Sequence, residues 1–334
     1  ANAWFTSYLT NRKQFVQVGD EHSETLQVTC GVPQGSILGP LLFILYINDI
    51  VHMSRLAELI MFADDTNLFF SGNDLITLTN TVNQELALLS RWFKLNKLSL
   101  NIKKTNYMLF RTCNNKLDND LNISIDGIKL SPVTKTKSLF INSTLTWNDH
   151  IAMIKSKISK NIGIISRIRF LVPRAVFLSL CHALVEPYLQ YCNLIWAAQC
   201  TSVLNELYRC QKKLLRIITF SDRRSHSLPL FKNLEILPVF SIDDLQVGCF
   251  MYSALHKLLP AYFDSMFAPN TTLHTHFTRS CNAVHQKQYR LNISKFSIRI
   301  HGPIVWNSLP RELQSLPSLK IFKKKFRQFF ITNL

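Results

Sequence analysis

Two adjacent carboxylates between two short apolar runs constrain the fold of this chain more than any other feature. Asp64 and Asp65 separate apolar runs at residues 59–62 and 68–70, and runs this short are typical of strands. We therefore predict a hairpin with both carboxylates at its tip. Neighbouring like charges repel each other, and a divalent cation bound through carboxylate oxygens removes that cost. The alternative is an ordinary polar turn, where Asp is common.

The composition favours a folded protein with a polyanionic partner. Of the 334 residues, 47% are hydrophobic and 18% are charged, which suits the cores of roughly two to three domains. The net charge of +17 favours nucleic acid as the partner, with an anionic membrane surface as the alternative. No apolar run reaches the ~20 residues of a membrane span, and no signal peptide is recognised. The 8 cysteines form no C-x-x-C pair, which indicates reduced thiols.

Helices and strands alternate up to about residue 130, and helices dominate from His150 onward. The first part is predicted to begin with the end of a helix at 4–9, a hairpin of strands 15–18 and 25–30, and a helix from Pro40 to about 51. The carboxylate hairpin follows, and then a helix that is capped by Asp74 and ends near Lys94. A strand at 107–110 and two strands at 123–125 and 128–130, joined at Asp126-Gly127, complete this part. The second part is predicted to contain helices at 151–170, 174–196, 203–220 and 242–259 and a basic helix at the C-terminus, with 269–297 unassigned.

A Gly/Pro-rich motif precedes the carboxylates. Residues 31–40 contain Pro33-Gln34-Gly35-Ser36, in which glycine permits close backbone approach to a nucleotide and Gln34 offers amide hydrogen bonds. By itself this motif is an ordinary loop. Followed by an apolar helix and then by Phe62-Ala63-Asp64-Asp65, it resembles reverse transcriptases, most closely those of non-LTR (LINE-type, jockey-like) retrotransposons.

The resemblance implies an RNA-directed DNA polymerase. Asp64 and Asp65 would hold Mg²⁺ in a two-metal site, Phe62 and Ala63 would lie near the primer terminus, and Gln34 and Gly35 would lie near the template or the incoming nucleotide. The implied partners are an RNA template, a DNA primer and dNTPs, without a membrane. The implied location is intracellular, in the cytoplasm and the nucleus, and not secreted.

Residues 92–105 resemble the next palm motif of the family. Lys104 matches the basic residue beside the leaving pyrophosphate, where a lysine donates a proton or neutralises charge. The alternative is a solvated loop lysine.

Leu145-Thr146-Trp147 with His150 resembles the hairpin that grips the primer. The stretch before it is shorter than the family pattern, lacks its Gly and has Asn142 where Asp is usual. The loss of two residues from a strand keeps the alternation of its side chains between the two faces but shortens the strand. This favours a degenerate copy.

The helices after His150 correspond to the thumb of the family. Their basic residues would contact duplex phosphates without reading sequence, and the alternative is a solvated helix face. These residues are Lys155, Lys157, Lys160, Arg167, Arg169 and Arg174.

Two weaker groups complete the candidates. His274, His276, Cys281 and His285 could bind zinc, but their spacing matches no standard site. Asp243 and Asp244 are predicted to be a carboxylate pair at a helix N-terminus and not a second catalytic pair.

The predicted fold class is α+β, with a partial polymerase palm followed by an α-helical thumb and a helical C-terminal region. The predicted domains are 1–130, a partial palm without its first catalytic motif; 131–220, the primer-grip hairpin and thumb; and 221–334, a helical region with a basic tail. Palms need a third carboxylate upstream of Gly31, and Asp20, in a predicted turn, does not suit that role. We therefore expect a C-terminal part of a longer Mg-dependent polymerase, inactive by itself. The alternative is a non-catalytic nucleic-acid-binding remnant or a co-opted retroelement protein.

Overall fold

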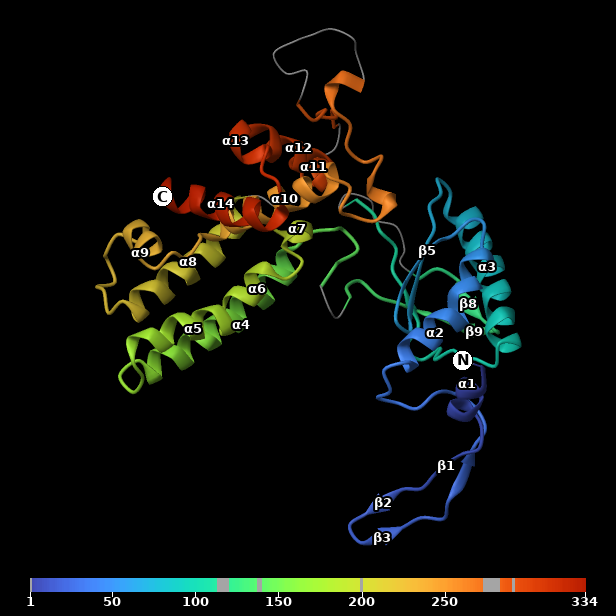
Figure 1. Ribbon diagram of the computed structural model, residues 1–334. Helices are drawn as coiled ribbons and strands as arrows, with labels where there is room; N and C mark the ends of the chain where they lie inside the picture. The colour runs from blue at the N-terminus through green and yellow to red at the C-terminus, as the bar shows by residue number, and fades with distance from the viewer. Residues whose placement is uncertain (1, 113–119, 137–139, 199–200, 273–282, 290–291) are drawn as a thin grey trace. The chain divides into compact units, whose positions relative to one another are not determined.

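The structure, a computed structural model, describes residues 2–112, 120–136, 140–198, 201–272, 283–289 and 292–334. The chain divides into two compact units (Figure 1). Unit 1 is Ala1–Leu109 with Lys116–Val133, and unit 2 is Phe110–Asn115 with Thr134–Leu334. Helices combine with small, mostly antiparallel sheets, so the α+β class is confirmed at this level. Among the described residues, no helix is long and apolar enough to cross a membrane.

Unit 1 combines short paired strands with two main helices. Its elements are α1 (Asn2–Leu9), β1 (Arg12–Gln14), β2 (Gln17–Val18), β3 (Glu21–His22), β4 (Leu26–Val28), α2 (Gly39–Ile47), the 3-10 helix η1 (Asn48–His52), β5 (Glu58–Phe62), β6 (Asp65–Phe69), α3 (Leu75–Leu95), β7 (Asn106–Tyr107), β8 (Ser124–Ile125), β9 (Ile128–Lys129) and β10 (Ser131–Pro132). The pairs β1–β4, β2–β3, β5–β6 and β8–β9 are antiparallel, and β7–β10 is parallel.

Helix α3 begins at the predicted cap. Asp74 accepts hydrogen bonds from the Thr77 backbone N–H at 2.8 Å and from the Thr77 hydroxyl at 2.7 Å, which satisfies donors that the first helical turn leaves open. The buried face of α3 presents Leu89 and Trp92 to α2 and η1. Tyr46 of α2 also donates a hydrogen bond to the Asn96 carbonyl at 2.6 Å. The two helices therefore form a support for the strands that pack against them.

Two predicted hairpins in unit 1 are found, with different bounds for one of them. Asp126 and Gly127 both have positive φ, at 52° and 78°, as a type I′ turn requires between β8 and β9. The N-terminal hairpin starts earlier than predicted, because Arg12–Gln14 pairs with Leu26–Val28 and the polar residues Glu21–His22 are themselves paired. The predicted strand at 107–110 is reduced to Asn106–Tyr107.

Unit 2 is almost entirely helical. Its elements are α4 (Asn148–Ile168), α5 (Arg174–Leu184), α6 (Glu186–Gln190), α7 (Asn193–Trp196), α8 (Thr201–Ile218), α9 (Leu228–Asn233), α10 (Val239–Leu255), the 3-10 helices η2 (Ala261–Phe263) and η3 (Asn270–Thr272), α11 (Asn292–Lys295), α12 (Ile298–Ser308), α13 (Arg311–Gln314) and α14 (Leu319–Thr332).

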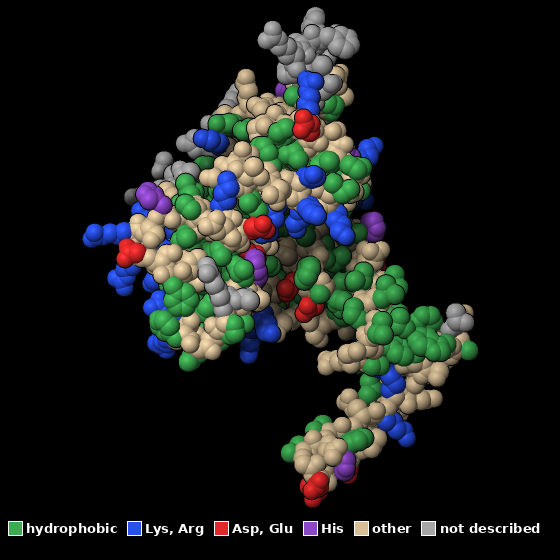
Figure 2. Space-filling view, turned by 60° about the vertical axis from the view of Figure 1, so that its left-hand side comes forward, with side chains coloured by type: hydrophobic (Ala, Val, Ile, Leu, Met, Phe, Trp, Pro, Cys, Tyr) green, Lys and Arg blue, Asp and Glu red, His purple; other side chains and the backbone are tan. Residues whose placement is uncertain are grey.

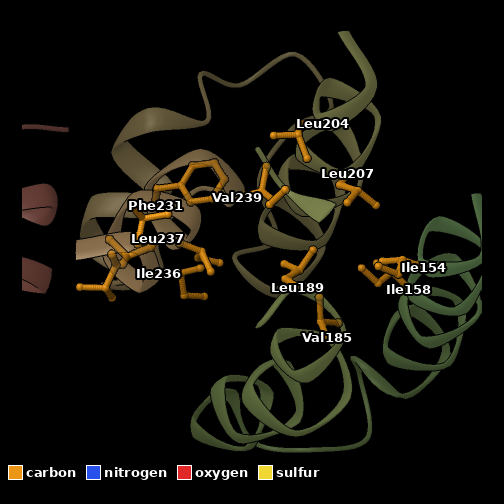
Figure 3. Packing of buried hydrophobic residues seen from close by; sticks show 14 of the residues in the cluster. Ile154, Ile158, Val185, Leu189, Leu204, Leu207, Phe231, Ile236, Leu237 and Val239 are labelled. Carbon is orange, nitrogen blue, oxygen red and sulfur yellow. The ribbon is translucent and has the colours of Figure 1, made fainter. Parts of the chain in front are cut away.

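One continuous core joins the helices of unit 2. The apolar stripe of α4 repeats at helical spacing and is buried along its whole length; its members are Ile151, Ile154, Ile158, Ile162 and Ile165. Figure 3 shows Ile154 and Ile158 turned toward the side chains of α6 and α8, with Phe231, Leu237 and Val239 farther along the same cluster. Burial of this many aliphatic side chains supplies the main stabilisation of unit 2.

Two predictions for unit 2 are wrong. A single helix at 174–196 does not form: the chain breaks before Pro187, which lacks an N–H, and again at Cys192, whose φ is +51°. Helix α10 begins at Val239, so Asp243 and Asp244 lie beyond its first turn and are not an N-terminal carboxylate pair. Asp243 is buried. Among the cysteines that the structure describes, all are free thiols, and Cys30 is exposed.

Candidate active site

The β5–β6 hairpin confirms the local structure predicted for the paired carboxylates. Leu59 pairs with Leu68, Met61 with Thr66 and Phe62 with Asp65. Alternation places Leu59, Met61 and Leu68 on the inner face, where they pack against the cluster of Ile47, Ile50, Leu89 and Trp92. The outer face is left to solvent, and Phe62 at its end is 81% exposed. The inner face thus holds the hairpin against the core of unit 1, while the tip of the hairpin is exposed.

A two-residue turn of Ala63 and Asp64 closes the hairpin. Ala63 has φ +53°, a left-handed conformation that costs an L-residue about 1–2 kcal/mol. Such strain at a hairpin tip is typical of functional sites. The turn places Asp64 directly beside Asp65, and both side chains are exposed. Within the described residues, neither carboxylate forms an ion pair or a side-chain hydrogen bond, so the pair carries uncompensated negative charge.

The 33–36 loop forms a tight turn in unit 1. Gly35 has φ +79° with open space around it, which glycine adopts without steric cost. Ser36 fixes the loop: its hydroxyl donates to the Pro33 carbonyl at 2.8 Å and accepts from the Gly39 N–H at 3.1 Å. Tyr8 also donates to this hydroxyl at 2.7 Å. Gln34 is exposed at the tip of the turn, where its amide is accessible.

Lys104 lies in an exposed turn before β7. Its backbone N–H donates to the Asn101 carbonyl at 3.0 Å, and its side chain is exposed. Phe62, Ala63, Asp64 and Asp65 lie together at one hairpin tip because they are consecutive in the sequence. In the described part of unit 1, no hydrogen bond or ion pair links Lys104 or the 33–36 loop to that tip.

The comparisons with known proteins agree with these motifs. Residues 1–161 match the family model for reverse transcriptase (RNA-dependent DNA polymerase). This part of the chain belongs to the reverse transcriptase family. No solved structure matches the chain.

The curated relatives that are similar to this chain are RNA-directed DNA polymerases of transposons and of a mobile element, in agreement with the predicted resemblance. A probable RNA-directed DNA polymerase from transposon X-element of Drosophila melanogaster is 25% identical over 70% of this chain and 26% of its own length. One from transposon BS of the same species is 29% identical over 69% of this chain and 27% of its own length. The RNA-directed DNA polymerase from mobile element jockey is 23% identical over 69% and 26%. The chain spans about a quarter of the length of these relatives.

Two residues of the predicted primer-grip segment, Trp147 and His150, lie in the interior of unit 2. Trp147 and His150 are 7% and 2% exposed, and the His150 ring lies 5.5 Å from the ring of Trp196. Burial, with a smaller effect of Lys157, lowers the pKa of His150. Neither ring nitrogen has a hydrogen-bond partner among the described residues. Trp147 and His150 therefore belong to the buried interior of unit 2.

Four of the basic residues predicted for the thumb helices, Lys155, Lys157, Lys160 and Arg167, are exposed on α4. Lys155 forms an ion pair with Glu206 of α8 at 2.9 Å, and Lys157 lies over the ring of Tyr188 at 5.4 Å. Arg169 lies over the ring of Phe170 at 4.5 Å. Lys160 and Arg167 are exposed, with no ion pair in the part of the chain that the structure describes. The side chain of Arg174 lies outside the described residues.

Helix α8 adds further basic residues beside α4. Ser159 and Cys210 approach to 4.0 Å, and the Lys155–Glu206 pair lies four residues earlier on each helix, so α4 and α8 run side by side in the same direction. Arg209 and Lys213 of α8 are exposed. Figure 2 shows Lys and Arg side chains (blue) dispersed over the visible face in several groups, with broad hydrophobic areas (green) between them. We call Lys160, Arg167, Arg209 and Lys213 the α4–α8 basic surface.

A group that the sequence did not predict lies between α10 and α12. Asp243, Asp244 and His301 bring one ligand atom each to within 4.8 Å of one another, and His301 Nε2 is 3.6 Å from Asp243 Oδ2. Burial, with repulsion from Asp243, raises the pKa of Asp244 to about 6. The contact with Asp243 raises the pKa of His301.

The zinc-type group proposed from sequence falls almost wholly outside the described residues. His274, His276 and Cys281 are not described. His285 is exposed, and its Nδ1 lies 3.3 Å from Asn270 Oδ1.

Proposed function

We propose that this chain is part of an RNA-directed DNA polymerase of a non-LTR retrotransposon and that the β5–β6 hairpin holds its divalent cations. The main support for this proposal is the pair of exposed carboxylates of Asp64 and Asp65, which have no ion-pair partner among the described residues. They lie on a hairpin whose other face packs against the core. Carboxylate oxygens of this kind suit Mg²⁺, which binds through one or two carboxylates plus substrate phosphates. Unit 1 would be part of the palm, and α4 with α8 would belong to the thumb.

The other residues of unit 1 have complementary roles in this proposal. The bound Mg²⁺ would supply activation of the primer hydroxyl and stabilisation of the leaving pyrophosphate. Phe62, beside Asp65, offers an exposed ring for stacking on the terminal base of the primer. Gln34 offers both donors and an acceptor to a template base or a nucleotide. Lys104 would neutralise the charge that develops on pyrophosphate.

The α4–α8 basic surface would bind the primer–template duplex. Its four side chains are exposed, and among the residues that the structure describes none of them forms an ion pair, so they are available to contact phosphates. Phosphate contacts position a duplex without reading its sequence, which suits a polymerase that copies any template. We place the complete protein inside the cell, in the cytoplasm and the nucleus, where its RNA template and DNA primer are found.

The experiment is primer extension by the purified chain on an RNA template with Mg²⁺ and dNTPs, beside Asp64→Asn, with primer–template binding followed in parallel. We expect both proteins to bind the duplex and neither to extend the primer, since the palm needs a third carboxylate. Extension by the wild type that disappears in Asp64→Asn would also support the proposal and would show that two carboxylates suffice. No binding of the duplex, or extension that Asp64→Asn leaves unchanged, would contradict it.

A non-catalytic nucleic-acid-binding role is the second candidate, and the region around Asn142 favours it. The Asn142 carbonyl oxygen accepts from the Thr146 N–H at 2.7 Å, and its amide donates to the Thr146 hydroxyl at 2.6 Å. The side chain of Asn142 thus stabilises the local turn, and no carboxylate is present at this position to contact a primer. In this case divalent cations would have no effect on duplex binding, and Asp64→Asn would bind like the wild type.

A further inference from the structure

Helices α10 and α12 approach closely because a glycine lies at their crossing. A Cβ on Gly302 would lie 2.6 Å from the sulfur of Met251, which is closer than real Cβ atoms come to their neighbours. The absence of a side chain at Gly302 therefore lets α12 lie against α10. His301, the preceding residue, is carried by this contact to the carboxylates of Asp243 and Asp244.

The polar atoms in this contact are not satisfied by the protein. Asp243 is 6% exposed, and its Oδ1 has no hydrogen-bond partner among the described residues. His301 Nε2 is likewise buried without a hydrogen bond in the part of the chain that the structure describes. Buried polar atoms are normally paired, and an unpaired one points to an unseen ligand or water. Here Asp243 Oδ1 has no partner among the described residues, and His301 Nε2 has only the long 3.6 Å contact with Asp243 Oδ2.

The spacing of the atoms suits ligands of one metal ion better than a hydrogen bond. His301 Nε2 and Asp243 Oδ2 are 3.6 Å apart, whereas a nitrogen–oxygen hydrogen bond is about 2.7–3.2 Å long. Two ligand atoms that each lie about 2.1 Å from a common ion stand roughly 3.0–3.5 Å apart at octahedral or tetrahedral angles. The three ligand atoms lie within 4.8 Å of one another, so the side chains would have to move closer together for all three residues to bind one ion.

We propose that Asp243, Asp244 and His301 form a structural metal site that ties α10 to α12. One imidazole with two carboxylates is a borderline ligand set, suited to a divalent transition metal such as Zn²⁺ rather than to Mg²⁺. A cation between the two carboxylates also removes the repulsion that opposes their joint ionisation. The site lies in unit 2 and is independent of the Asp64–Asp65 hairpin.

A metal at this place would stabilise the C-terminal part of the chain. The residues between α10 and α12 form a long connection, and a link between its ends restricts the unfolded chain as well as fixing the crossing of the helices. Structural metal binding is coupled to folding in this way. The expected consequence is a higher melting temperature when the metal is present.

The test uses the full 334-residue chain, stripped with a chelator and dialysed against Zn²⁺, with bound zinc counted by elemental analysis and melting followed by circular dichroism. We expect Asp243→Asn and His301→Gln each to lose one equivalent of zinc, or to bind it at least about 10-fold more weakly, and to lose the zinc-dependent rise in melting temperature. Asp264→Asn and His226→Gln change exposed residues of unit 2 and should keep both. Mg²⁺ should not replace Zn²⁺.

Three outcomes decide against the site. Equal zinc counts and equal melting shifts in wild type and both variants would overturn the proposal, as would loss of the same equivalent in Asp64→Asn. If Asp243 and His301 form only an ion pair, Asp243→Asn will melt lower without metal and zinc will change nothing. If His301→Gln does not fold, the decision falls to Asp244→Asn, whose side chain is only partly buried.

Discussion

Phe62 lies directly opposite Asp65 in the β5–β6 hairpin, as the last pair before the turn. The pairing puts a ring that is 81% exposed on the same face as a carboxylate, and Asp64 follows the ring by two residues. An apolar surface for a base and oxygens for a cation thus meet at one tip. Under the proposed function this tip would receive the end of a primer. The arrangement depends on a register that the inner residues of the hairpin fix.

The strain at Ala63 predicts that a glycine there stabilises unit 1. Ala63→Gly should raise the protection of hairpin and α3 amides by up to about 1 kcal/mol, because glycine tolerates positive φ without a steric penalty. Hydrogen exchange followed by mass spectrometry over residues 58–95 measures this. Ala87→Gly, at an exposed position in the middle of α3, is the matched control and should lower protection by about 1 kcal/mol. Equal losses in both variants would show that Ala63 is not strained.

The α4–α8 basic surface predicts a specific salt dependence of duplex binding. Lys160→Ala and Arg167→Ala should each weaken binding of a primer–template at low salt and reduce the slope of log K against log salt by about 1. Fluorescence anisotropy at several salt concentrations gives this slope. Lys295→Ala removes an exposed lysine of α11 and should leave the slope unchanged. If all three variants behave alike, net charge and not this surface governs binding.

The buried His150 predicts that unit 2 loses stability in acid. Its pKa is lowered in the folded state from an unfolded value of 6.5, so the unfolded chain binds the proton more tightly. Its contribution is fully present above pH 6.5 and is lost progressively as the pH falls from 6.5 toward the folded pKa. His150→Phe, which keeps an aromatic ring between Trp147 and Trp196, should make this loss smaller.

Urea unfolding at pH 7.5 and pH 5.5 measures that difference. Exposed His226 provides the control, because His226→Gln should retain the pH dependence of the wild type. An identical pH dependence in His150→Phe would mean that His150 does not cause the loss. Asp244 and His301 act in the opposite direction, because their pKa values are raised in the folded state and they stabilise unit 2 as the pH falls.

The apolar stripe of α4 predicts a sharp contrast between two isoleucines. Ile158 is 0% exposed and Ile164 is 52% exposed. Ile158→Ala should destabilise unit 2 by about 2–5 kcal/mol, since it removes buried methylenes and leaves a cavity. Ile164→Ala should change the stability by less than about 0.5 kcal/mol. Thermal unfolding of both variants tests the packing of Figure 3, and equal effects would contradict it.

The sequence predicted best where local chemistry decides the structure. Asp74 forms a helix cap, Asp126-Gly127 forms a turn with two positive φ angles, and Asp64 lies at a hairpin tip. Each of these depends on residues close together in the chain. The domain boundaries at 130 and 220, the catalytic role assigned to Lys104 and the template- or nucleotide-binding role assigned to Gln34 remain predictions.

The sequence failed where distant segments decide the structure. The break at Cys192 has a left-handed residue at a position where nothing in the local sequence requires one. Asp243 looked like part of a helix start because the first turn of α10 was placed three residues too late. Its neighbour His301 lies on α12, a helix with an internal Pro303 that was not predicted. Only the close crossing at Gly302 brings these residues together.

The most direct test of the account is Mn²⁺ binding to the hairpin, measured by the loss of the free-ion EPR signal. The measurement is made in the His301→Gln background, so that the α10–α12 cluster does not contribute. We predict that the chain binds Mn²⁺, that Mg²⁺ competes for it, and that Asp64→Asn with Asp65→Asn abolishes the binding. Unchanged Mn²⁺ binding in that double variant would contradict the claim that the hairpin is the metal site of a polymerase.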